Sequence, residues 1–220
     1  MKVKGGVIWD MDGVLVDSAP FHYRAWRRLW EERGIYFSEE EFYKTFGMRN
    51  DAIIHRILGE EVSEKEIREI GKIKEEYFRC FAKGRIKPKP GVREILEGLK
   101  EEGFLHAVAT SGPRENLDLV LEETGIKHFF TALVCGEEVK RGKPHPEIFL
   151  RAAQKLSLPP SRCIVVEDAP AGIEGSKRAG MKSIGVSGTH PSYRLNMADM
   201  VIDDFRKVKV EDFFKLLSES

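Results

Sequence analysis

Short apolar runs alternate with longer helical patterns over most of the chain. Glycine and proline mark the ends of the helical stretches, which cover residues 92–102, 115–123, 147–156 and 171–179. Apolar runs of strand length lie at 7–9, 105–109, 132–135, 163–166, 182–186 and 200–202. Continuous apolar runs separated by helices are typical of a parallel sheet covered on both faces. The pattern predicts a doubly wound α/β fold.

One stretch, from about residue 19 to residue 87, breaks this alternation. Aromatic and aliphatic residues recur at helical spacing from Phe21 to Trp30. Further helical patterns cover 39–43, 51–58 and 63–81, and no strand pattern appears. We therefore expect a Rossmann-like catalytic core, residues 1–17 and 88–220, with an inserted small helical cap, residues 18–87. The hinges between them are predicted at 17–20 and 86–90.

Composition excludes several classes of function. The 220 residues include 36 Lys and Arg and 36 Asp and Glu, so no net basic charge favours a nucleic-acid partner. The three cysteines are too widely spaced for a disulfide framework or a zinc site, which predicts reduced thiols. No apolar signal region follows Met1, and no run approaches the ~20 residues of a membrane span. We expect a cytoplasmic monomer or small homo-oligomer with a small-molecule partner and no membrane association.

Polar side chains follow the apolar runs where ligands bind an open parallel sheet, at the carboxyl ends of its strands. These residues are Asp10, Asp12, Thr110, Ser111, Glu167 and Asp168, with Lys143 on a loop between the later runs. Crowded carboxylates repel one another and need a cation, and oxygen ligands without a His/Cys cluster favour Mg²⁺. A carboxylate can attack phosphorus to give an aspartyl-phosphate, and a second one can transfer the protons. Lysine and Mg²⁺ would neutralise the transferring oxygens.

The same segments resemble, in order, the four motifs of the haloacid dehalogenase-like (HAD) superfamily. They start at Asp10, Thr110, Gly142 and Val166. The resemblance implies that Asp10 is the nucleophile and a metal ligand. Asp12 would be the general acid/base, with its backbone carbonyl on Mg²⁺. True dehalogenases need neither this second aspartate nor Mg²⁺, so Asp12 favours phosphoryl chemistry.

The later motifs imply the remaining roles at the site. Thr110 would hold a phosphoryl oxygen, helped by backbone amides near Ser111. Lys143 would pair with the nucleophile and the phosphate. Asp168 would complete the metal site, and Glu167 would be a metal ligand or a partner behind it.

The inserted helices resemble the small cap of the β-phosphoglucomutase and phosphoglycolate-phosphatase branch. Arg49 lies where such caps present an arginine to the substrate, and Lys74 matches a cap lysine. His22 is either a packing residue or a catalytic aid. Mutases carry a Ser-Lys-Asn type run after the second motif for a distal phosphate, whereas this chain has Gly112, Pro113 and Arg114. Arg114 is a candidate substitute for that run.

The sequence therefore predicts a Mg²⁺-dependent phosphatase that hydrolyses a small phosphorylated metabolite, such as a sugar phosphate, through an aspartyl-phosphate. The first alternative is a β-phosphoglucomutase-like mutase, in which a sugar hydroxyl rather than water attacks the aspartyl-phosphate. A lower alternative is a non-catalytic metal-binding or interaction protein. Loss of Asp10, Lys143 or the acidic pair would favour that reading, and all are present.

Overall fold

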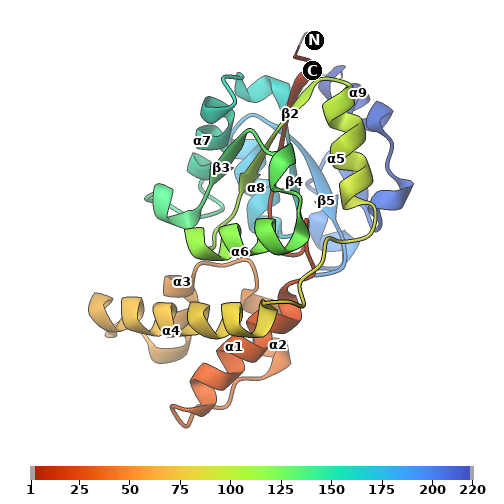
Figure 1. Ribbon diagram of the computed structural model, residues 1–220. Coiled ribbons are helices and arrows are strands. Elements are labelled where there is room, and N and C mark those ends of the chain that lie inside the picture. The colour runs from red at the N-terminus through yellow and green to blue at the C-terminus, as the bar shows by residue number, and fades with distance from the viewer. Residues whose placement is uncertain (1–2, 219–220) are drawn as a thin grey trace.

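The computed structural model describes residues 3–218 and contains a parallel six-stranded sheet (Figure 1). The strand order is β3-β2-β1-β4-β5-β6, and every neighbouring pair is parallel. The strands are β1 (Gly5–Trp9), β2 (Phe104–Ala109), β3 (Ala132–Val134), β4 (Cys163–Glu167), β5 (Lys182–Val186) and β6 (Met200–Ile202). Each coincides with a predicted apolar run to within two residues at either end. The expected Rossmann-like α/β fold is confirmed.

Side chains of the central strands alternate between two cores. Val7 and Trp9 enter one hydrophobic cluster and Ile8 enters the other, and all three are fully buried. Helices on the first face are α5 (Val92–Glu101), α6 (Arg114–Thr124) and α9 (Val210–Ser218). Those on the second are α7 (Glu147–Lys155) and α8 (Pro170–Arg178). The helix α9, which buries Phe213 and Leu216, was not predicted from the sequence.

The inserted segment folds into helices with a core of their own. They are α1 (Ala19–Glu31), α2 (Glu39–Thr45), α3 (Asn50–Leu58) and α4 (Glu64–Ala82). Trp26, Trp30 and Phe42 are central to this third cluster, which is separate from the two clusters beside the sheet. Ser63 is the N-cap of α4 and forms a capping box, in which its Oγ accepts from the amide of Glu66 and the Glu66 carboxylate accepts from the amide of Ser63.

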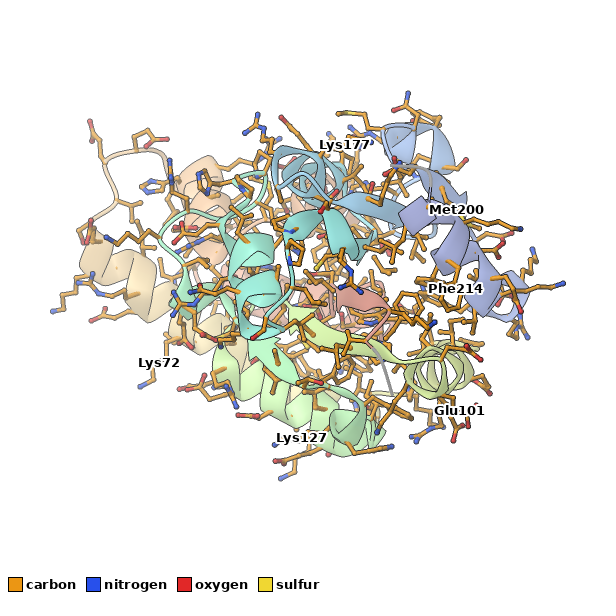
Figure 2. The ribbon with its side chains drawn as sticks, turned by 90° about the horizontal axis from the view of Figure 1, so that it is seen from above. Lys72, Glu101, Lys127, Lys177, Met200 and Phe214 are labelled. Carbon is orange, nitrogen blue, oxygen red and sulfur yellow. The ribbon has the colours of Figure 1, made fainter. Side chains whose placement is uncertain are left out.

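The helical insert lies beyond the carboxyl ends of the strands, opposite the two chain termini (Figure 1). In Figure 2, the view from above, Lys72 of α4 and Phe214 of α9 lie on opposite sides of the molecule. The two connections to the insert run side by side, because Val16 forms an antiparallel bridge with Pro88. The Lys89 side chain also donates to the carbonyl of Gly13 at 2.8 Å. The insert therefore faces the edge of the sheet that carries the predicted chemistry.

The cysteines and the length of the apolar helices also bear on the class of protein. Cys135 and Cys163 are buried, Cys80 is exposed, and all three are free thiols. Between residues 3 and 218, no helix combines the length and apolar character needed to cross a membrane.

Candidate active site

The predicted site residues gather at the topological switch point of the sheet, where the strand order changes direction. β1 and β4 are neighbours at this switch point, and ligands of doubly wound folds bind there. Asp10 follows β1, and its amide donates to the carbonyl of Val166 on β4 at 2.9 Å. Glu167 ends β4, with Asp168 next to it. The strand register therefore brings three carboxylates to one point.

Lys143 lies between two of these carboxylates. Its Nζ is 2.5 Å from Oδ1 of Asp10 and 2.6 Å from Oε1 of Glu167. Its side chain is only 4% exposed, so the charges meet with little water between them. Burial alone lowers the pKa of Lys143, but the two carboxylates more than offset it and the pKa lies above the ordinary value. The lysine is therefore a fixed cation beside Asp10.

One lysine does not neutralise the whole cluster. Burial, followed by the charges of Glu167 and Asp12, raises the pKa of Asp10 to about 7 despite the Lys143 contact. Burial and the charges of Glu167 and Asp10 also raise the pKa of Asp168 well above its usual range. Both shifts indicate that Lys143 alone does not balance the negative charge of the ionised carboxylates.

The acidic cluster fits a hard divalent cation. Asp10, Glu167 and Asp168 each offer an oxygen, and these atoms lie within 4.8 Å of one another. Among residues 3–218, Oδ2 of Asp168 is buried and has no hydrogen-bond partner. By contrast, both oxygens of Glu167 are engaged, one by Lys143 and the other by the amide of Ala169 at 2.8 Å. The donor set is all oxygen, as Mg²⁺ prefers.

Two glycines allow these carboxylates to approach the backbone. A Cβ at Gly13, where φ is +77°, would lie 1.8 Å from Oδ2 of Asp168. A Cβ at Gly172 would lie 2.0 Å from the Glu167 carboxyl group. Glycine is thus required on both sides of the site, since any larger residue would displace a carboxylate.

Asp12 faces the helical insert. Its Oδ1 accepts hydrogen bonds from Oγ of Ser18 at 2.5 Å and from Nε2 of His22 at 3.1 Å. Burial alone would raise the pKa of Asp12, but the interaction with His22 and the hydrogen bond from Ser18 bring it below its ordinary value. Without a ligand, Asp12 is therefore ionised and able to accept a proton.

His22 connects Asp12 to a buried polar chain in the insert. Nζ of Lys74 lies 2.8 Å from Nδ1 of His22 and 2.8 Å from Oε1 of Glu75. Because an ammonium can only donate, Nδ1 accepts, and the proton on Nε2 points toward Asp12. The imidazole also stacks on Phe78, with ring centroids 3.9 Å apart. His22 thus packs on Phe78, as one of the two expectations had it, and also contacts Asp12.

Glu75 extends this chain to the core and was not identified from the sequence. Its carboxylate accepts from Nδ2 of Asn50 at 2.8 Å and from Nδ2 of Asn116 at 2.6 Å. Asn116 belongs to α6, so the contact crosses from the insert to the core. Neither asparagine lies in a recognisable motif, and a buried acid next to a lysine on a helix has no distinctive spacing.

These residues surround one cavity. Asp10, Asp12, Thr110, Ser111 and Lys143 form its core side. Asn50, Lys74 and Glu75 form its polar wall on the insert, together with His22 and the apolar side chains of Trp26, Phe42, Phe46, Met48 and Ile53. Thr110 is almost fully buried, and its Oγ1 accepts from the amide of Gly112 at 3.1 Å.

The two predicted substrate-binding arginines lie elsewhere. Arg49 lines a neighbouring cleft, where its Nε is 3.4 Å from Oδ1 of Asp51 and its side chain packs on Gly142. Arg114 lines neither cavity, because its exposed guanidinium pairs with Asp118 one helical turn later, at 2.9 Å. The structure therefore places neither guanidinium in the cavity with Asp10.

An α/β fold with an aspartate directly after its first strand and an acidic pair after the neighbouring strand is typical of a class of hydrolases, and comparison with known proteins agrees. Residues 7–186 match the model of the haloacid dehalogenase-like hydrolase family. The chain belongs to this family, which confirms the resemblance found in the sequence motifs and the expectation of an enzyme.

Similar proteins include phosphatases and a mutase. A phosphorylated carbohydrates phosphatase of Thermotoga maritima is 36% identical over 180 residues, which cover 81% of this chain and 82% of the relative. The chloroplastic 5-amino-6-(5-phospho-D-ribitylamino)uracil phosphatase of Arabidopsis thaliana is 32% identical over 96% of this chain, which spans only 57% of that protein. The crystal structure of β-phosphoglucomutase from Clostridium difficile has a TM-score of 0.88 and 29% identity, covering 99% of this chain and 98% of the other.

Proposed function

We propose that this enzyme is a Mg²⁺-dependent phosphatase that hydrolyses a small phosphorylated metabolite, such as a sugar phosphate, through an aspartyl-phosphate on Asp10. The observation that carries the proposal is the contact of Lys143 with Asp10 and Glu167, in a cavity that also contains Asp12. A fixed cation beside a buried carboxylate suits attack on a phosphoryl group. Phosphatase names among the similar proteins support the same class.

Asp10 and Asp12 would divide the chemistry. A carboxylate oxygen of Asp10 forms a bond to phosphorus, and the bond from phosphorus to the ester oxygen breaks. Asp12 gives its proton to the departing oxygen, then accepts one from the water that cleaves the aspartyl-phosphate. A phosphoryl dianion beside Asp12 raises the pKa of its carboxyl group, which favours the protonated form needed in the first step. Thr110 and the amides near Ser111 would hold the phosphoryl oxygens.

The carboxylates of Asp10 and Asp168, with the backbone carbonyl of Asp12, would hold the Mg²⁺. The unpartnered Oδ2 of Asp168 is the best evidence for a cation there. Glu167 fits a supporting position next to these ligands, because both of its oxygens are already engaged. The ion would supply positive charge for the transferring phosphoryl oxygens.

We further propose that residues 18–87 act as a cap on a core made of residues 1–17 and 88–220. The separate hydrophobic cluster of α1–α4 and the paired connections at Val16 and Pro88 support this division. Opening of the cap would admit substrate and release product, and closure would exclude bulk water. Arg49, which packs on Gly142 of the Lys143 loop, would then serve at the border between the two parts.

A second candidate function is intramolecular phosphoryl transfer on a sugar phosphate. The similarity to β-phosphoglucomutase over nearly the whole chain favours it. The two functions differ only in whether water or a sugar hydroxyl attacks the aspartyl-phosphate. Product analysis separates them.

The test measures phosphate release from a panel of phosphate esters, with Mg²⁺ and with EDTA. The panel includes β-glucose 1-phosphate, whose conversion to glucose or to glucose 6-phosphate is followed. Mg²⁺-dependent phosphate release is expected, and Asp10→Asn should abolish it while preserving the fold, since the change keeps the side-chain volume. Conversion to glucose 6-phosphate with little free phosphate would favour the mutase. Full turnover by Asp10→Asn would exclude an aspartyl-phosphate at this residue.

A further inference from the structure

Under the proposed function, the cavity wall formed by the insert would contact the part of the substrate that leaves with the ester oxygen. Its polar members are Asn50, Lys74 and Glu75 on the insert, and the last two are 3% and 6% exposed. The rest of this wall is mainly apolar and includes Trp26 and Ile53. The charges and hydrogen-bonding groups that these three residues present to the cavity determine which leaving groups fit.

Both ammonium groups in the cavity are already paired with carboxylates of the protein. Among the described residues that line it, Lys143 and Lys74 are the lysines, and no arginine is present. Lys143 already contacts Asp10 and Glu167, and it is also the cation nearest the phosphoryl position. Lys74 contacts Glu75 and His22. A second phosphate or a carboxylate would therefore meet no lysine in this cavity that is free of a carboxylate partner, and burial of an uncompensated charge is unfavourable.

Glu75 adds a negative charge to that wall. Lys74, Asn50 and Asn116 all donate to its carboxylate. Burial raises the pKa of Glu75, but the charge of Lys74 and these hydrogen bonds outweigh it, so the group is ionised at neutral pH. The Lys74–Glu75 pair is neutral as a whole and can hydrogen-bond hydroxyl groups. For a further anion, the Glu75 carboxylate opposes the attraction of Lys74.

We propose that the enzyme is selective for phosphate monoesters whose leaving group is an uncharged polyol, and that Glu75 is the residue that excludes a second anionic group. This inference rests on the proposed phosphatase function and specifies its substrate class. Hydroxyl groups can donate to Glu75 and accept from Lys74 or Asn50, while the apolar wall contacts the carbon skeleton. The same selection disfavours the mutase, because attack of a sugar phosphate on the aspartyl-phosphate places a bisphosphate in the cavity.

The experiment compares kcat/KM for pairs of esters that differ by one charged group. The pairs are fructose 1-phosphate with fructose 1,6-bisphosphate, and 2-hydroxyethyl phosphate with phosphoglycolate. In the wild-type enzyme, the ester with the uncharged leaving group should be favoured in each pair, at least about tenfold in kcat/KM. Glu75→Gln, which preserves size and removes the charge but turns one accepting oxygen into a donating amide, should reduce this preference about tenfold or more. The exposed neighbour Glu76 provides the matched control, since Glu76→Gln should leave the ratio unchanged.

Each outcome decides a different point. A wild-type preference for the esters with a charged leaving group would overturn the inference, but the enzyme would still be a phosphatase. An unchanged ratio in a folded Glu75→Gln variant would remove Glu75 from the selection. If the variant does not fold, the wild-type ratios alone decide whether charge is excluded. No phosphate release from any ester would instead contradict the proposed function.

Discussion

The Nζ of Lys143 lies 2.5 Å from Oδ1 of Asp10, although the two residues are 133 positions apart in the sequence. The contact closes the active-site cavity between the end of β1 and the loop before α7. It also fixes the only lysine on the core side of that cavity, within the described residues. Replacing Lys143 therefore tests both catalysis and stability.

Lys143→Met should lower kcat/KM by about 10²-fold or more, because an electrostatic contact to the reacting group is lost. It should also destabilise the fold by about 3–5 kcal/mol in metal-free buffer, since two buried carboxylates lose their partner. Steady-state kinetics and urea denaturation measure the two effects. Lys140→Met, on the exposed part of the same loop, is the control. Near-wild-type kinetics for Lys143→Met would exclude a role for this ammonium in turnover.

Gly13→Ala tests how closely the first motif must approach Asp168. Its Cβ would lie 1.8 Å from Oδ2 of Asp168 and 2.6 Å from Oγ1 of Thr189, so Asp168 must move. We expect at least a 10²-fold loss of kcat/KM, because Asp168 is displaced, and a loss of the rise in Tm that bound Mg²⁺ should give the wild type.

The matched control is Gly34→Ala. Gly34 has a similar φ, +72°, but a Cβ there would meet no atom within 4 Å. Both variants therefore carry the same left-handed backbone cost, about 1 kcal/mol. Equal effects of the two substitutions on activity and on the Mg²⁺ response would show that the approach to Asp168 is unimportant.

His106 makes stability depend on pH. It lies in the core on β2, where Nδ1 accepts a hydrogen bond from Nε1 of Trp9 at 3.0 Å. Burial lowers the pKa of His106 to about 4, from 6.5. Between these values the unfolded chain binds the extra proton, so this stability is present above pH 6.5 and is lost as pH falls.

The loss attributable to His106 should be about 2 kcal/mol between pH 7 and pH 5. Urea denaturation of the wild type and of His106→Gln at both pH values measures it, since glutamine retains an acceptor for Trp9 but does not titrate. The free energy of unfolding should fall more steeply with acid in the wild type. Parallel pH profiles would mean that His106 is not the group responsible.

Much of the site could be predicted from the sequence because the periodicity of the strands determines it. Once the apolar runs are assigned to parallel strands, their carboxyl ends must lie along one edge, and Asp10, Thr110 and Asp168 follow. Lys143 sits on a loop, so its position depended on the family resemblance. The structure adds the distances that turn this assignment into a charged cluster.

Other parts could not be predicted, because local sequence does not determine how one lobe packs on another. Glu75 and Asn116 meet only when α4 lies against α6, and nothing in either helix pattern indicates that contact. The resemblance placed Arg114 next to the second motif but could not give its side-chain direction. Asp118, one turn further along α6, draws the guanidinium away from the cavity.

Asn116 joins the helical insert to the core through two residues one turn apart on α4. Its Nδ2 donates to Oε2 of Glu75 at 2.6 Å, and its Oδ1 accepts from Nη1 of Arg79 at 3.0 Å. Asn116→Ala should cost about 1–3 kcal/mol, because a buried carboxylate oxygen and a guanidinium lose their partner. It should also loosen the insert, so that amide hydrogen exchange increases in α4 and at residues 86–90 more than in the sheet.

Asn116→Asp gives a sharper form of the same test. Its side chain has nearly the same shape but places a negative charge beside Glu75, so exchange in α4 should increase further than in Asn116→Ala. Glu115→Gln, at an exposed neighbouring position on α6, is the control and should not change the exchange pattern. If the two Asn116 variants exchanged like the wild type in α4, this contact would not hold the insert against the core. Closure would then depend on other contacts between the two parts, such as that of Arg49 with Gly142.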